Sequence, residues 1–239
     1  MASTGHNDPC AVDEAQARRL FTRFGIASAR DVIVTSAAEA ESAARDLGGR
    51  VALKILSAEI THKSDVGGVA VGLDAATVGV RLERMREEVR ARAGAAPARF
   101  LVQEMAAGVE MILGLQRDPL GAAILVGMGG VNAELMRDTV LRMPRAGALT
   151  RDEARDMVCA LKSFPLLDGF RGAPKADVEA LVSAVVAFSP MCAALGERLV
   201  VAEINPLFVS ADGVRAADGV AVLKASGVIA SAGQGGVHG

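Results

Sequence analysis

Two carboxylates and an amide near the end of the chain could hold a divalent cation. Glu203 and Asn205 are two residues apart in the apolar run 200–207, which predicts a strand, so their side chains point to the same face. A turn at Asp212 would return the chain and bring Asp218 close to this pair. Oxygen donors of these kinds suit Mg²⁺ and leave positions for water and phosphate. Alternatively, the amide only starts a turn and Asp218 only caps the chain end.

An upstream lysine and a pair of glycines could bind nucleotide phosphates. Lys54 interrupts an otherwise apolar strand at 51–56, and Gly67 and Gly68 precede a second strand at 69–73. Glycines allow successive backbone N–H groups to approach phosphate oxygens, and the lysine supplies a positive charge for the same oxygens. Taken alone, the stretch is explained equally well by a β-hairpin with a glycine-rich turn and a lysine that reaches out to solvent.

Several helices must position these groups. Four helix starts are predicted from capping residues that precede helical periodicity, at Asp13, Ser36, Asp74 and Thr150, and Pro174 leads into a further long helix from Asp177 to about Leu195. The apolar stretch 180–196 contains two serines and a proline and is shorter than a typical membrane span of about 20 residues. We therefore expect it to form a buried helix.

Short strands are expected from residue 99 onward. Candidates at 99–105, 110–116 and 122–126 predict an antiparallel meander, and a second glycine loop follows at 127–130. Glycine, alanine and proline at 94–97 interrupt the helical pattern before these strands, so a boundary between two parts of the chain is expected there.

Composition limits the function further. The chain has 239 residues with 26 Lys and Arg against 28 Asp and Glu, so the formal net charge of −2 argues against nucleic-acid or membrane binding. Its three cysteines have neither disulfide nor zinc spacing, which predicts a reduced, intracellular chain. The N-terminus lacks the features of a signal peptide, which favours the cytoplasm. We expect flexible tails at 1–11 and 225–239.

Five ordered blocks carry a resemblance that covers residues 12–223. They read LKILSAEITHKSDVGGVAVGL, VQEMAAGVEMILGLQRDP, GMGGVNAELMRD, LLDGFRG and AEINPL. In this order and spacing they resemble the ATP-grasp chain of the ADP-forming acyl-CoA synthetases, a superfamily that includes acetate–CoA ligases and, more distantly, succinyl-CoA synthetase. The resemblance implies an α+β ATP-grasp fold. A small lid subdomain at 12–97 and a larger one at 98–224 would hold ATP between them.

The resemblance also implies an activity and its partners. The chain would be the nucleotide-binding subunit of an acid–thiol ligase that converts carboxylate, CoA and ATP to acyl-CoA, ADP and phosphate, through an acyl phosphate and a phosphohistidine. ATP and Mg²⁺ would be its cofactors. A CoA-binding α-type subunit carrying the phosphorylated His would be its partner, and a small carboxylic acid and CoA would be its substrates.

Site residues follow from the positions that match the family motifs. The magnesium ligands would be Glu203, Asn205 and Asp218, although the segment 216–219 departs from the Leu-Asp-Ala-Arg form of close relatives while keeping the acid. The nucleotide contacts would be Lys54, Gly67 and Gly68 at the phosphates, Gln103, Glu104 and Met105 at the adenine edge through backbone groups, and Glu110 near the ribose.

Three further residues are candidates for catalysis. His62 is the only imidazole outside the tails, and it could accept and return a phosphoryl group, with Lys63 and Asp65 beside it to orient it or neutralise charge. A loop histidine that only forms hydrogen bonds is the alternative. Arg142 matches an arginine near the terminal phosphate, and Glu134 lies in the same segment, which is more polar here than in the family pattern.

Two other functions use the same fold. A regulatory nucleotide-binding module, as in fused relatives with a degenerate synthetase portion, has less need of the complete set of lysine, histidine and metal ligands. Another ATP-grasp carboxylate ligase would need no CoA-binding partner. The sequence does not indicate which carboxylic acid is used.

Overall fold

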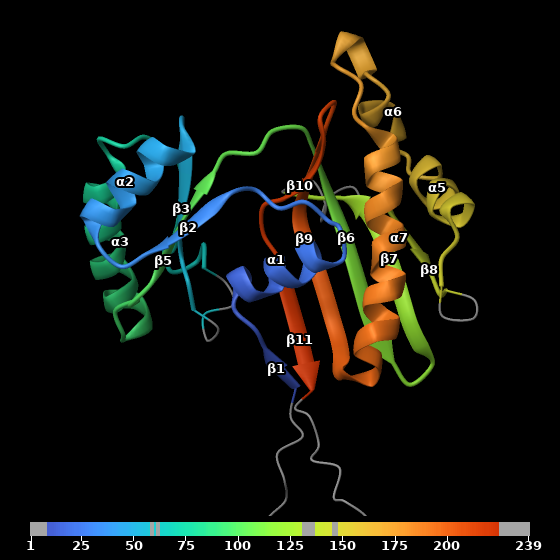
Figure 1. The fold of residues 1–239 in the computed structure, drawn as a ribbon, viewed down its shortest axis with the longest axis horizontal. Coiled ribbons are helices and arrows are strands. Elements are labelled where there is room, and N and C mark those ends of the chain that lie inside the picture. Colours follow the sequence, from blue (N-terminus) through green and yellow to red (C-terminus); the bar gives the residue numbers. More distant parts are fainter. Residues whose placement is uncertain (1–8, 58–59, 61–62, 131–136, 145–147, 225–239) are drawn as a thin grey trace, which may run out of the picture.

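The computed structural model describes residues 9–57, 60, 63–130, 137–144 and 148–224, which form two units, each built on its own sheet (Figure 1). The larger unit has a seven-stranded sheet in the order β1-β11-β9-β6-β7-β8, with β10 paired to β9. The smaller unit has a four-stranded sheet in the order β2-β5-β3-β4. Every strand pairing within these two sheets is antiparallel.

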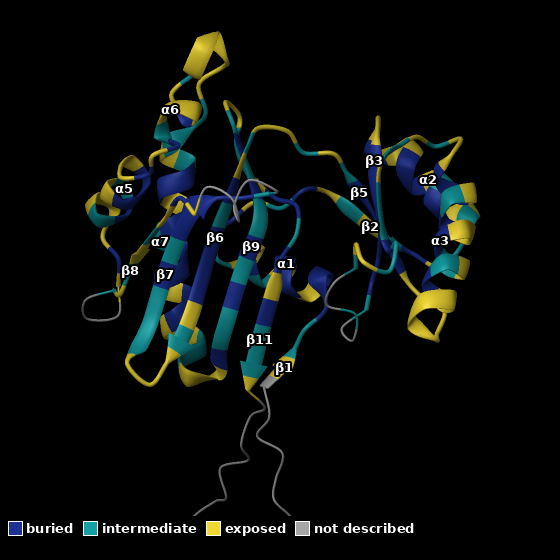
Figure 2. Cartoon of the chain, turned by 180° about the vertical axis from the view of Figure 1, so that it is seen from behind, coloured by how far each residue is buried: buried dark blue, intermediate teal, exposed yellow. Residues whose placement is uncertain are grey.

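The larger sheet is covered by helices on one face. Its strands are β1 (Pro9–Ala11), β6 (Val109–Asp118), β7 (Gly121–Met128), β8 (Thr139–Arg142), β9 (Leu199–Ser210), β10 (Gly213–Ala216) and β11 (Val220–Lys224). The helices α1 (Glu14–Arg23), α5 (Arg151–Cys159) and α7 (Val178–Leu195) contribute buried residues to the core of this unit. In Figure 2 the strands β6, β7 and β9 lie in front of α7, so the other face of the sheet is open.

Short helical turns connect α5 to α7 and α7 to β9. The segment with α6 (Phe164–Leu167) and η2 (Phe170–Gly172) projects beyond the end of α7 (Figure 1). The turn η3 (Gly196–Arg198) leads from α7 directly into β9.

The smaller unit packs two helices on one face of its sheet. Its strands are β2 (Asp31–Val34), β3 (Val51–Ile55), β4 (Val69–Leu73) and β5 (Phe100–Glu104), and its helices are α2 (Ala37–Leu47) and α3 (Val78–Ala93). Alternate residues of β3 and β5 are buried against these helices, and the residues between them point to the opposite face. Lys54 and Gln103 lie on that opposite face, which is turned toward the larger unit.

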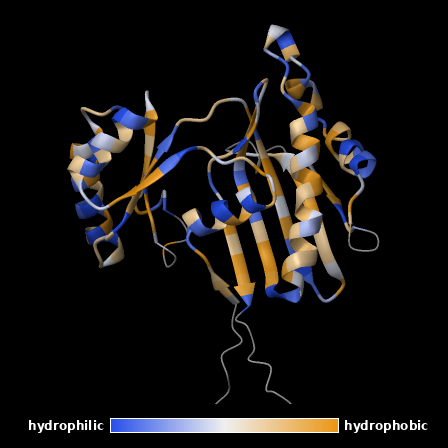
Figure 3. Ribbon diagram, viewed as in Figure 1, coloured by the Kyte–Doolittle hydropathy of each residue, from blue (hydrophilic) through white to orange (hydrophobic). Residues whose placement is uncertain are grey.

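The predicted buried helix is confirmed as α7. It is long and apolar enough to cross a membrane by length and composition, with a mean hydropathy of 1.9 over an 18-residue window within Val178–Arg198. In the structure it packs on the larger sheet, and its Phe188 ring stacks on Phe21 of α1 at a centroid distance of 6.1 Å. Figure 3 shows that the strands beneath it are also largely hydrophobic. The helix therefore belongs to the core of the larger unit.

Three of the four predicted capping residues are confirmed, and the long helix expected from Asp177 is present as well. Asp13, Ser36, Thr150 and Asp177 each accept a hydrogen bond from a backbone N–H in the first turn of α1, α2, α5 and α7. Asp74 is not an N-cap, because its carboxylate accepts from the N–H groups of Ala76 and Thr77 and closes a turn before α3 begins.

Three predictions about the organisation of the chain are wrong. The strand predicted at 99–105 does not join a meander with its successors, because β5 pairs with β2 and β3 in the smaller sheet. A division at residue 97 therefore separates β5 from its own unit, and it also assigns α1 to the smaller unit although α1 packs in the larger core. Residues 9–11, expected in a flexible tail, form strand β1 beside β11.

Candidate active site

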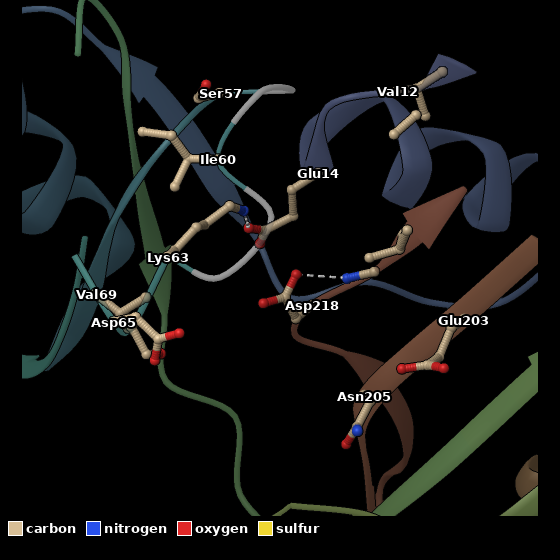
Figure 4. A pocket seen from close by; sticks show the side chains of 14 residues that line it. Val12, Glu14, Ser57, Ile60, Lys63, Asp65, Val69, Glu203, Asn205 and Asp218 are labelled. Atoms are coloured by element: carbon tan, nitrogen blue, oxygen red, sulfur yellow. Dashed lines mark hydrogen bonds and ion pairs between the residues drawn. The ribbon is translucent and has the colours of Figure 1, made fainter. Parts of the chain in front are cut away.

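A cavity of about 410 Å³ lies between the two units. The larger unit lines it from β9, β11 and the start of α1, and the smaller unit lines it from the loop between β3 and β4 (Figure 4). Charged and polar side chains in its wall include Glu14, Lys63, Asp65, Glu203, Asn205 and Asp218. The cavity therefore brings together residues that are far apart in the sequence.

The three predicted metal ligands all line this cavity. Glu203 and Asn205 point from β9 to the open face of the larger sheet, and Asp218 lies in the connection between β10 and β11. Asn205 accepts a hydrogen bond through Oδ1 from the Gly130 N–H at 3.1 Å. Among the described residues, no three acidic, histidine or cysteine side chains are grouped to hold a metal by themselves. A cation at this place would use the two carboxylates and the amide oxygen.

Electrostatics at the two carboxylates favours a cation. Burial raises the pKa of Glu203 above its ordinary value, and the negative charge of Asp218 raises it further. Burial also raises the pKa of Asp218, where Lys54 acts in the opposite direction and Glu14 adds to the rise. A hard divalent cation between these oxygens would compensate for the cost of burying two carboxylates and for the repulsion between them. The donor set therefore fits Mg²⁺.

Lys54 is buried and fully engaged. Its side chain points away from the helices of the smaller unit, and Nζ donates to Glu14 Oε1 at 3.0 Å and to the Ala217 carbonyl at 2.8 Å. Asp218 Oδ2 lies 3.7 Å from the same nitrogen. The alternative that this lysine reaches out to solvent is wrong, since the residue is only 6% exposed.

Glu14 is a residue of the site that the sequence did not reveal. It stands in the first turn of α1, is 4% exposed, and binds Lys54 through Oε1 and Lys63 through Oε2. Burial opposes ionisation of this carboxyl, but the charges of Lys54 and Lys63 outweigh it and lower the pKa. An acidic residue after an N-cap is ordinary in any helix, because it complements the helix dipole, so the sequence offered no distinguishing signal.

The glycine pair forms a turn in this structure. Gly67 and Gly68 donate their N–H groups to the carbonyls of Ser64 and Lys63, at 3.0 and 2.7 Å, within a hairpin that joins β3 to β4. Gly67 has φ of +74°, and a Cβ at Gly68 would lie 2.7 Å from Ile55 Cδ1. The turn and its packing therefore require these glycines, and their N–H groups are not presented to a ligand here.

The predicted adenine-edge strand is β5. Gln103 is buried on the face shared with Lys54, and within the described part of the chain its Nε2 has no hydrogen-bond partner. The Glu104 side chain instead pairs with Arg30, with Oε2 2.6 Å from Nε. Met105 is exposed and donates its N–H to the Arg50 carbonyl at 3.3 Å. The Gln103 amide is thus a buried donor without a partner among the described residues.

Two other predicted residues, Glu110 and Arg142, do not line the cavity wall described above. Glu110 is exposed on β6, where its carboxylate lies against Gly130, the residue that donates to Asn205. Arg142 ends β8 opposite Ile124, in a row of residues that faces the core, and β8 is separated from β9 by β6 and β7. The structure therefore does not bring Arg142 to the cavity. His62 and Glu134 lie outside the described residues.

Comparison with known proteins agrees with this geometry. A model of the ATP-grasp domain family matches residues 6–223, and the chain belongs to this family. It is 30% identical to the β subunit of acetate–CoA ligase [ADP-forming] II from Pyrococcus furiosus. The aligned region of 220 residues covers 90% of this chain and 92% of that subunit. Within the ATP-grasp family it is therefore a chain of the ADP-forming acyl-CoA synthetases, which are acid–thiol ligases.

Solved structures give the same result. The acetyl-coenzyme A synthetase 1 of Ca. Korarchaeum cryptofilum, in complex with coenzyme A, Ca-AMPCP and HgCl⁺, superposes with a TM-score of 0.83 at 33% identity, over 90% of this chain and 94% of that one. A form of the same enzyme with coenzyme A and Mg-AMPPCP gives a TM-score of 0.75 at 32% identity, over 90% and 93% of the two chains. The predicted α+β ATP-grasp fold, enzyme class and cofactors are confirmed at the level of the family.

Proposed function

We propose that this chain positions MgATP for an ADP-forming acyl-CoA synthetase, in which carboxylate, CoA and ATP give acyl-CoA, ADP and phosphate. The observation that carries the proposal is the cavity between the two units, where lysines from the smaller unit face the oxygen donors of the larger one. Phosphoryl transfer depends mainly on in-line positioning and on cations around the moving group. The lysines and the oxygen donors around this cavity are groups of the kind that such a reaction uses.

The metal would be held by the larger unit. Glu203 and Asn205 are fixed by their register on β9, and Asp218 is held by a hydrogen bond to its Oδ1 from the Gly219 N–H at 2.7 Å. When bound, Mg²⁺ supplies positive charge for the phosphate oxygens. The three side chains orient it on the open face of the sheet.

The nucleotide would be held mainly by the smaller unit. Lys54 and Lys63 supply two positive charges at the cavity, and the free amide of Gln103 lies on the same face of the sheet as Lys54. Antiparallel pairing of β3 with β5 places Lys54 opposite Leu101 and Ala52 opposite Gln103, so the lysine and the amide are about two residues apart along the sheet. We place the phosphates at the lysine end of this strand pair and the base at the amide end.

A second subunit would complete the enzyme. The relatives named as β subunits imply a partner and CoA. We propose that the partner is a CoA-binding α-type subunit, that a histidine on it carries the phosphoryl group from this site, and that an acyl phosphate is the other intermediate. His62 stays a candidate for a second phosphoryl-carrying histidine. We also place the protein in the cytoplasm, in keeping with its free cysteines.

Reconstitution tests the proposal. The purified chain is mixed with a CoA-binding α-type subunit of an ADP-forming synthetase, ATP, Mg²⁺, CoA and a panel of small carboxylic acids, and ADP and acyl-CoA are measured together. We expect equal amounts of both products, only when both subunits are present, and strongly reduced amounts with Asp218→Asn. Nucleotide binding without turnover for any acid would instead favour a regulatory module. Turnover without a partner would favour another carboxylate ligase.

A further inference from the structure

Helix α1 is a bridge between the two units. On one side, Ala17 and Phe21 pack in the core of the larger unit. On the other side, Glu14 binds Lys54 and Lys63, and Arg18 binds Asp31 of β2 with 2.6 Å between Nη2 and Oδ1. Figure 1 shows α1 between the two sheets. The contacts of its first turns with the smaller unit are thus made largely by charged groups.

The Glu14 carboxylate divides its oxygens between two lysines. Oε1 accepts from Lys54 and Oε2 accepts from Lys63, and the Glu14 side chain is only 1% exposed. Figure 4 shows Glu14 and Lys63 meeting at the edge of the cavity, next to Asp218. A single buried anion therefore fixes the positions of both ammonium groups.

The two lysines differ in what they can still bind. An ammonium group has three donors, and Lys54 directs them to Glu14, to the Ala217 carbonyl and toward Asp218. Lys63 also lines the cavity, and among the interactions of the described residues its ammonium group binds only Glu14. Lys63 is therefore the lysine with donors left for a phosphate.

We propose that Glu14 is a positioning residue that holds Lys63 at the cavity in the absence of nucleotide and competes with the phosphates for it. The inference rests on the proposed nucleotide site. A phosphate that approaches Lys63 must share its ammonium group with the Glu14 carboxylate, so the attraction between the phosphate and this lysine is weakened. Glu14 thus keeps Lys54 and Lys63 paired in the free protein and lowers the affinity for the polyphosphate.

This role predicts an increase in affinity on mutation. Glu14→Gln removes the negative charge but keeps the size of the side chain, so Lys63 is no longer shared with a carboxylate and we expect MgATP to bind on the order of tenfold more tightly. Adenosine has no phosphate, so its affinity should stay the same. A residue that only supported the fold would weaken both ligands when it was replaced.

A double-mutant cycle tests the proposal. Calorimetric titrations with MgATP and with adenosine are run on the wild type, Glu14→Gln, Lys63→Met and the double variant, each checked for folding by circular dichroism. We expect Glu14→Gln to bind MgATP more tightly, Lys63→Met to bind it more weakly, and the gain from Glu14→Gln to vanish in the Lys63→Met background.

The outcomes separate this inference from the function it rests on. If the folded wild type binds no MgATP, the nucleotide site and the inference are both overturned. If the wild type binds MgATP but Glu14→Gln binds it equally or more weakly, or if the gain persists with Lys63→Met, only the role of Glu14 is overturned. Should Glu14→Gln fail to fold, unchanged MgATP affinity in Lys63→Met overturns the inference.

Discussion

Lys54 and Glu14 form a buried ion pair that joins the smaller sheet to a helix of the larger unit, with 3.0 Å between Nζ and Oε1. Both side chains are almost inaccessible, at 8% and 1% exposed. Removing one partner of such a pair is destabilising, because the buried charge that remains loses part of its compensation. The pair therefore ties the stability of the protein to the contact between its two units.

Replacing Lys54 alone should destabilise the protein. Lys54→Met leaves Glu14 with one of its two lysines, so we expect the free energy of unfolding to fall by about 3 kcal/mol. Urea denaturation measures this change. The double variant Lys54→Met with Glu14→Gln is the control and should recover part of the loss. A loss in the double variant equal to the sum of the single losses would show that the pair is not coupled.

Asp138 should make stability depend on acid pH. Burial opposes ionisation of its carboxyl, but hydrogen bonds from the Ser163 and Lys162 N–H groups, at 2.7 and 3.0 Å, outweigh this and lower the pKa. A lowered pKa in the folded state adds stability above the unfolded value of about 3.9, and this stability is lost as the pH falls through the folded value.

The Asp138 prediction is checked by urea denaturation between about pH 3 and pH 6. We expect the wild type to lose more stability toward pH 3 than Asp138→Asn, because the amide cannot titrate. Parallel curves for the two proteins would show that this carboxyl does not contribute.

Gly68 should tolerate no side chain. A Cβ there would meet Ile55 Cδ1 at 2.7 Å and the Lys63 carbonyl at 2.9 Å. We expect Gly68→Ala to lower the free energy of unfolding by about 1–3 kcal/mol, as overpacking does. Gly114→Ala is the matched control, because its Cβ would lie 3.7 Å from the Ala202 carbonyl, an ordinary contact. Similar losses in both variants would refute the steric explanation.

The residues of the site differ in how far the sequence could reveal them. Glu203 and Asn205 are predictable from the sequence, because residues two apart on a strand face the same side of a sheet whichever strands pair with it. Glu14 was not found, because its partners Lys54 and Lys63 are 40 and 49 residues away in sequence and nothing local distinguishes it. The glycine pair was correctly located, but its N–H groups serve the turn in this structure.

Strand pairing was the main source of error in the fold. β5 has a clear strand pattern, but its neighbours β2 and β3 precede it by a long stretch that includes α3, and such non-local pairing leaves no local signal. Helix starts were more predictable, since the capping residues Asp13 and Thr150 act within three positions. Asp74 shows that residue type alone does not define a helix start, because an aspartate can also accept hydrogen bonds within a turn.

Arg142 should not contribute to nucleotide binding. Its position on β8 faces the core of the larger unit, and two strands separate it from β9. We expect Arg142→Gln to bind MgATP within about twofold of the wild type, a change below 0.5 kcal/mol or so. A loss of about tenfold in a folded variant would instead show that this arginine reaches the phosphates when the nucleotide is bound.

Calorimetric titration of the chain with ATP, with and without Mg²⁺, tests the central claim most directly. The wild type is compared with Asp218→Asn, and Arg142→Gln serves as the charge-changing control away from the cavity. We expect binding that requires Mg²⁺ and that Asp218→Asn weakens about tenfold or more, as the loss of one charged ligand implies. Binding that is equal with and without Mg²⁺, or unaffected by Asp218→Asn, would contradict a metal–nucleotide site in this cavity.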